Sequence, residues 1–192
     1  MPLIVDKEKE RLKILQAFEK CIEEKTIDNI TLRDIARKAN MTHPKLLNYF
    51  ENKEDLVLSY CEYAKEYMSK HCKDWFDSHD IKDYKTPLDY MNAFMEYVAT
   101  GGTHENRPTA TLQTYVLAKY NGKIQDMVTS EFKSWKEVMY SCLKKVYKNK
   151  VSEDQAEAMM ILITGTFVCN YTKALSGSIN KEIISSFKPL LK

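Results

Sequence analysis

The most regular feature of this sequence is a long amphipathic segment between Lys123 and Lys148. Apolar side chains recur in it every three or four residues, which is the spacing of one helix face. The stripe consists of Ile124, Met127, Val128, Phe132, Trp135, Met139, Cys142 and Val146. It predicts a helix of about seven turns, and such a helix needs other elements to cover its apolar face.

The rest of the chain also predicts an all-α fold. Its 192 residues include only five glycines and five prolines, which leaves little material for tight hairpins. No run of strict polar–apolar alternation bounded by turn residues predicts a strand. Periodicity and capping residues predict about nine helices: 7–24, 31–40, 42–50, 52–80, 87–100, 109–120, 123–148, 152–175 and a short last one.

Charge, cysteines and hydropathy narrow the class of protein. The net charge is +2, and residues 1–53 hold 11 basic against 9 acidic side chains, so the positive excess lies there. Five cysteines without a C-x-x-C pair argue against a disulfide framework or a structural zinc site. The N-terminus is charged from Asp6 onward, which predicts no signal peptide, and the longest apolar run, 158–169, is shorter than the roughly 20 residues that span a bilayer. We expect a cytoplasmic protein with no membrane association, no metal ion and no cofactor.

Residues 31–56 contain the pattern with the clearest functional meaning. Two short helices, capped by Thr31 and Thr42, are joined by a turn at Asn40, and a longer helix follows at once. The segment is too small to have a core of its own. It must therefore pack on the apolar stripe of the first helix, which we expect to be Leu12, Leu15, Phe18 and Ile22. A short helix supported in this way, with its polar side outward, is what a helix-turn-helix places in the major groove of DNA.

The motifs of this region resemble the TetR family of transcriptional regulators. They are I-L-x-A-F from Ile14, T-L-R-D-I-A-x-x-A from Thr31, L-x-x-Y-F from Leu46 and N-K-E-D-L from Asn52. The resemblance covers about residues 10–60, and the remaining chain matches the family only in helix number, length and order. It implies a three-helix DNA-binding domain, residues 1–51, and a larger helical ligand-binding and dimerisation domain, residues 52–192.

The resemblance and the residue types together give a candidate DNA-binding site. Thr31 and Thr42 cap helices whose first N–H groups can face phosphates. Lys53 resembles a lysine with which the family clamps a phosphate. The predicted site comprises Thr31, Arg33, Thr42, His43, Lys45, Leu47, Asn48, Tyr49 and Lys53.

Side-chain chemistry assigns some of these residues to bases, and two positions depart from the family pattern. Arg33 and Lys45 are suited to guanine and Asn48 to adenine. Asn40 stands where the family usually has glycine, and asparagine also tolerates the left-handed backbone of such a turn. Leu47 stands where the family commonly has a tyrosine that contacts the DNA backbone, so one hydroxyl contact is missing.

The two remaining sites are predicted by resemblance and by composition. The helices that surround the family's ligand cavity carry Tyr63, Tyr67, Met91, Phe94, Met95, Tyr115, Trp135 and Met139, although each of these also suits a plain core. The last two long helices resemble the family's dimer interface, and the second is apolar on two sides. The candidate dimer residues are Met127, Met159, Ile163, Phe167 and Tyr171, the alternative being a monomeric core.

By resemblance, the chain is expected to be a homodimeric regulator of double-stranded DNA. The expected mechanism is repression from a palindromic operator and release by a small-molecule effector. The sequence contains no catalytic motif, so an enzyme is not expected. Two alternatives stay open: an all-helical small-molecule carrier and a protein-interaction module, each with a non-functional DNA-binding segment.

Overall fold

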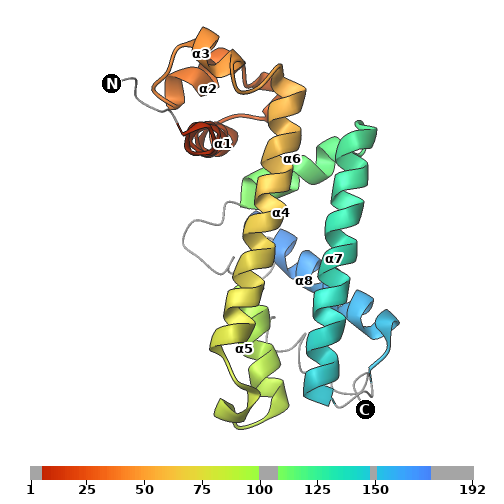
Figure 1. Cartoon of the computed structure of the whole chain (residues 1–192). Helices are drawn as coiled ribbons and strands as arrows, with labels where there is room; N and C mark the ends of the chain where they lie inside the picture. Colours follow the sequence, from red (N-terminus) through yellow and green to blue (C-terminus); the bar gives the residue numbers. More distant parts are fainter. Residues whose placement is uncertain (1–5, 100–107, 148–150, 174–192) are drawn as a thin grey trace. The chain divides into compact units, whose positions relative to one another are not determined.

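The computed structural model describes residues 6–99, 108–147 and 151–173, and the regular structure in them is entirely helical (Figure 1). The α-helices are α1 (Lys7–Ile22), α2 (Leu32–Lys38), α3 (His43–Leu47), α4 (Lys53–Ser78), α5 (Pro87–Ala99), α6 (Pro108–Ala118), α7 (Gly122–Tyr147) and α8 (Glu153–Thr172). They confirm the predicted all-α class and the order of the first eight helices. The predicted last helix lies outside the described residues.

The chain divides into two compact units. Unit 1 comprises Met1–Glu66 and Thr109–Met127, and unit 2 comprises Tyr67–Pro108 and Val128–Lys192. Helices α4 and α7 each contribute residues to both units. The predicted boundary after residue 51 divides a DNA-binding part from a ligand-binding and dimerisation part, not one compact unit from the other. It stays a prediction.

The core of unit 1 holds α1, α2, α3 and the start of α4 together. Ile14 and Phe18 of α1 are fully buried, and the Phe18 ring meets the Tyr60 ring edge to face at 5.3 Å between centroids. The predicted stripe was wrong at one position, because Leu12 is 38% exposed and Ile14 lies in the core instead. The α1 face that meets α2 is therefore centred on the Ile14–Phe18 row, which is one i, i+4 step of a helix.

The core of unit 2 is richer in aromatic and sulfur-containing side chains. Trp75 of α4 packs near Tyr90 and Phe94 of α5, with ring centroids 5.1 and 5.0 Å away. The other buried residues of this core include Met91, Met139, Cys142, Leu143, Val146, Met159, Met160 and Ile163. Methionine side chains adapt their shape readily, so this core tolerates rearrangement better than an aliphatic one.

Short local features define the helix ends. The 3-10 helices Ile27–Asn29 and Ile81–Asp83, which the sequence analysis did not predict, follow α1 and α4. The predicted capping box at Ser152 and Gln155 is present, with the Ser152 N–H donating to Gln155 Oε1 at 2.8 Å. Within the described residues no helix is both long enough and apolar enough to cross a membrane.

Candidate functional site

The first helix of the candidate site, α2, begins with a reciprocal cap. The Asp34 N–H donates to Thr31 Oγ1 at 3.1 Å, and the Thr31 N–H donates to Asp34 Oδ2 at the same distance. These contacts confirm Thr31 as the N-cap and complete a capping box. The bonds from the Thr31 main chain and hydroxyl lower the pKa of the Asp34 carboxyl.

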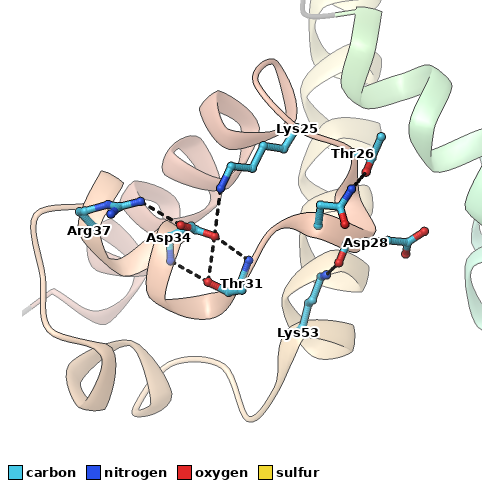
Figure 2. Close-up of polar contacts among 8 residues, drawn as sticks. Lys25, Thr26, Asp28, Thr31, Asp34, Arg37 and Lys53 are labelled. Carbon is cyan, nitrogen blue, oxygen red and sulfur yellow. Dashed lines mark hydrogen bonds and ion pairs between the residues drawn. The ribbon is translucent and has the colours of Figure 1, made fainter.

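Asp34 also joins α2 to the end of α1. Figure 2 shows its carboxylate between Lys25, which follows α1, and Arg37 of α2, with N–O distances of 3.4 and 2.9 Å. Lys38 forms a further ion pair with Glu24. These exposed pairs add little energy individually, but together they fix where α2 starts relative to α1.

The turn between α2 and α3 depends on Asn40. Its φ of 54° is left-handed, which confirms the expectation for this position. The Met41 N–H donates to Ala36 O at 2.9 Å and the Asn40 N–H to Arg37 O at 3.2 Å. This pair of bonds is a Schellman motif, which satisfies the last carbonyls of α2 and reverses the chain within two residues.

Helix α3 presents one apolar and one polar side. Thr42 caps it by accepting from the Lys45 N–H at 3.4 Å, with Pro44 in the first turn. Leu46 and Phe50 are buried in the core of unit 1. Arg33, Thr42, Leu47 and Asn48 are exposed, while His43, Lys45, Tyr49 and Lys53 are half-buried. The side of α3 opposite its buried edge is therefore exposed, as it must be for a helix that enters the major groove of DNA.

Two of the predicted DNA-binding cations already have partners in the protein. Lys45 Nζ lies 3.1 Å from Glu10 Oε2 of α1. Lys53 Nζ donates to the main-chain oxygen of Asp28 at 3.0 Å, as Figure 2 shows, and burial lowers the pKa of its ammonium group. Lys53 thus connects the start of α4 to the segment after α1, a role that the sequence analysis did not predict.

Arg11 of α1 is a structural residue that the sequence analysis missed. Its Nη1 donates to Tyr49 O at 2.6 Å and its Nη2 to Ser59 Oγ at 3.2 Å, and its guanidinium lies 4.4 Å from the centre of the Phe50 ring. One planar side chain thereby connects the end of α3 to α4. Nothing in the local pattern of α1 distinguishes Arg11 from the other charged residues there, because its partners lie about forty residues away along the chain.

Gln113 of α6 was missed for the same reason. Its Oε1 accepts from the Ile27 N–H at 2.6 Å, and its Nε2 donates to Ile22 O at 3.2 Å and to Lys25 O at 3.3 Å. Thr109 adds a bond to Glu23 at 2.9 Å. Helix α6 is therefore joined to the segment that connects α1 with α2, and belongs to the same compact unit as the helix-turn-helix.

Unit 2 contains a cavity that includes part of the predicted ligand site. Phe94, Trp135 and Met139 line it. Met91 lies in the core, and the Tyr67 ring packs on His71 with 4.1 Å between centroids. Tyr63 and Tyr115 belong to unit 1, and the side chain of Met95 lies outside the described ones. The predicted set therefore does not form one cluster within either unit.

The candidate dimer residues of α8 divide between the core and the surface. Met159 and Ile163 are buried within unit 2, Tyr171 is exposed, Met127 of α7 is half-buried, and the Phe167 side chain lies outside the described ones. The exposed apolar residues of α8 are Ile161, at 66% exposure, Val168 and Tyr171. Gly165 lies on the same side as Ile161, and a Cβ added to it would have no atom of the described residues within 4 Å.

Comparison with known proteins gives one sequence match and several structural ones. Residues 14–60 match the model of bacterial regulatory proteins of the tetR family. No curated protein matches the sequence.

The fold is similar to that of Salmonella enterica GusR, at 15% identity and a TM-score of 0.75 over 98% of both chains. A TetR transcription regulator from Haloarcula marismortui ATCC 43049 has 14% identity and a TM-score of 0.75 over 96% of both. Reduced E. coli NemR has 13% identity and a TM-score of 0.74 over 94% of this chain and 96% of its own.

Proposed function

From residues 14–60, which make this chain a TetR-family regulator, we propose that it is a homodimeric repressor, released from a palindromic operator by a small-molecule effector. That it is a DNA-binding transcriptional regulator is the premise. Repression, effector release and dimerisation are proposals, as is a cytoplasmic location, which follows from action on DNA.

The observation that carries the proposal is the exposed side of α3. Leu46 and Phe50 fix the helix to the core, the capping threonines and the Asn40 turn fix its ends, and Asn48 stays exposed. A rigid, short, exposed helix can enter the major groove without a change in the rest of unit 1. Asn48 is then suited to adenine and Arg33 to guanine or a phosphate.

We propose that the dimer forms through α8. Support comes from Ile161 and Val168, exposed apolar residues seven positions apart, and from Gly165, which leaves open space between them. An exposed apolar stripe with a small residue at its centre favours close helix crossing. This surface replaces Met159 and Ile163 as the proposed centre of the contact, because both are already buried in the protomer.

The effector is proposed to bind in unit 2. The support is the cavity lined by Phe94, Trp135 and Met139, whose surroundings are apolar and adaptable. Binding shifts DNA affinity only when the effector has different affinities for the DNA-binding and released states.

The test is fluorescence anisotropy of the full-length protein with DNA that flanks its own gene, over a series of salt concentrations. Arg33→Ala should weaken binding and reduce the slope of log affinity against log salt by about one. Lys133→Ala, which removes another exposed cation, from unit 2, is the matched control and should change neither. Equal losses in both variants would show a general charge effect and contradict an interface on α2 and α3.

Two further variants separate the regulator from the alternatives. Asn48→Ala should lower the preference for the flanking DNA over random DNA, while Leu47→Tyr should raise affinity by adding a hydroxyl for the DNA backbone. A lost sequence preference at Asn48 and a gained affinity at the adjacent Leu47 cannot both result from unfolding. If a folded dimer bound no DNA, the carrier would become the leading function, and capture of a protein partner through α3 would favour the interaction module.

A further inference from the structure

Among the described residues that line the cavity of unit 2, the one ionisable group is a thiol. The cavity is lined by residues of α4, α5, α7 and α8: Ser69, Cys72, Phe94, Trp135, Val138, Met139, Met160, Ile163 and Thr164. Neither an ammonium nor a carboxylate is among them. An ion moved from water into such surroundings would lose its hydration without gaining an opposite charge.

One residue that lines this cavity has a polar atom without a partner. Trp135 Nε1 is buried and has no hydrogen-bond partner. Within the described part of the chain, the other such buried side-chain atom is Asn92 Oδ1, and Asn92 is not among the residues that line the cavity. The indole N–H can only donate, so what is missing is an acceptor. Buried donors without acceptors are rare in folded proteins because leaving them unpaired is unfavourable.

The cavity is small in this structure but has adaptable walls. Its volume of about 30 Å³ suits about two water molecules. Met139 and Met160, unbranched side chains, form part of its lining and can move aside for a larger occupant. Beside it lies a groove of about 430 Å³ that shares Ser69 and Val138, so an occupant that enlarges the cavity has room to extend.

Charged side chains line the groove rather than the cavity. Lys73 and Asp77 of α4 and Glu137 of α7 lie there, all exposed. The thiol in the cavity wall is also neutral at physiological pH, because burial raises the pKa of Cys72 to about 11. A protonated thiol is a poor nucleophile, which favours non-covalent binding over capture of an electrophile.

We propose that the effector places in this cavity a neutral, mainly apolar group, aromatic or alicyclic, that bears one hydrogen-bond acceptor for the Trp135 indole N–H. That the occupant is an effector rests on the proposed function. The chemistry of the occupant is inferred from the cavity alone. Ionised groups of the same molecule are confined to the groove.

The experiment compares three probes of similar size on the full-length dimer: acetophenone, ethylbenzene and benzoate. Acetophenone has the neutral acceptor, ethylbenzene has none, and benzoate carries a charge. Calorimetric titration should give about fivefold tighter binding of acetophenone than of ethylbenzene, the effect of one neutral hydrogen bond, and no binding of benzoate at the same concentrations. In Trp135→Phe, which keeps the ring but removes the donor, acetophenone and ethylbenzene should bind equally.

Trp75→Phe is the matched control, because it is the same substitution at the chain's other tryptophan, outside the cavity. It should keep the ranking of the three probes. It also leaves Trp135 as the source of the one indole N–H signal in a ¹H–¹⁵N spectrum. That signal should move downfield with acetophenone and much less with ethylbenzene.

The inference is overturned when acetophenone does not bind, when benzoate binds as tightly, or when Trp135→Phe keeps the preference for acetophenone. The ranking of probes on the unmodified protein stands even where the Trp135 variant does not fold. DNA anisotropy without any probe tests the regulator separately. Salt-dependent DNA binding without the probe ranking rejects the effector chemistry alone, and the ranking without DNA binding rejects the regulator alone.

Discussion

Units 1 and 2 differ in how their polar side chains are paired. In unit 1, side chains of Arg11, Lys53 and Gln113 bond to main-chain oxygens of other elements, which fixes the helix-turn-helix. In the described part of unit 2, Trp135 lines a cavity together with two methionines, and its Nε1 stays unpaired. This difference fits the proposed function, in which unit 1 enters a DNA groove with fixed geometry and unit 2 admits a ligand through an unsatisfied donor and adaptable packing.

The strongest test of this contrast truncates one phenylalanine in each unit. Phe18 and Phe94 are both almost fully buried. Replacement of a buried phenylalanine by alanine lowers the free energy of unfolding by about 3–5 kcal/mol, and by less where neighbours can collapse into the space. Phe18→Ala should fall at the upper end and Phe94→Ala, beside Met139 and Met160, at the lower end, as measured by urea unfolding. The reverse order would break the comparison.

Gln113→Ala tests the fixed geometry of unit 1 without touching its apolar core. The variant leaves the Ile27 N–H and the Ile22 and Lys25 carbonyls without their partner, so we expect thermal unfolding to report a loss of about 1–3 kcal/mol. DNA affinity should fall with it. Gln125→Ala, at an exposed glutamine of α7, is the control and should change stability by less than about 0.5 kcal/mol. Equal effects would show that the three bonds contribute nothing specific.

The sequence predicts features that depend on near neighbours along the chain better than features that depend on distant ones. Local signals predicted the helices, the caps Thr31 and Thr42 and the left-handed Asn40, because each depends on neighbours within four residues. The 3-10 helix Ile27–Asn29 and the roles of Arg11 and Gln113 depend on partners far along the chain, which periodicity does not encode.

The candidate ligand and dimer sites were harder for a related reason. Aromatic and methionine residues at helical spacing have the same pattern whether they line a cavity, fill a core or contact a second protomer. The sequence therefore grouped Tyr63 with Trp135, which belong to different units, and Ile163 with Tyr171, of which one is buried and the other exposed. Leu12 was wrongly assigned to the core because spacing alone does not determine which residues lie at the centre of a helix face and which lie at its edge.

Gly165→Ala sharpens the comparison on the surface of unit 2. Within the protomer the substitution is favourable, because glycine in a helix is unfavourable by roughly 0.5–1 kcal/mol relative to alanine and the added Cβ meets no described atom within 4 Å. At the proposed crossing of two α8 helices, however, the Cβ would meet the second protomer, so we expect a lower thermal midpoint and more monomer in sedimentation velocity. A higher midpoint with an unchanged dimer would contradict a close contact at Gly165.

The smallest expected effect is the pH dependence of the α2 cap. The pKa of Asp34 is lowered in the folded state by its bonds from Thr31. As the pH falls below about 4, the unfolded chain takes up this proton first, so the stabilisation present above that pH is lost until the folded carboxyl is also protonated. Thermal unfolding of Asp34→Asn between about pH 6 and 3 should show a flatter acid slope than the unmodified protein. Parallel curves would contradict the role of the Asp34 charge.

The ion pair between Lys45 and Glu10 bears on how the regulator searches a chromosome. Attraction to random DNA comes almost wholly from cations that displace counterions from phosphates, whatever the sequence. In the proposed complex with DNA, a lysine held by a carboxylate of its own protein offers less of that attraction until a matching operator displaces the carboxylate. Fewer molecules are then occupied by the vast excess of random sites, so a lower copy number per cell keeps one operator filled.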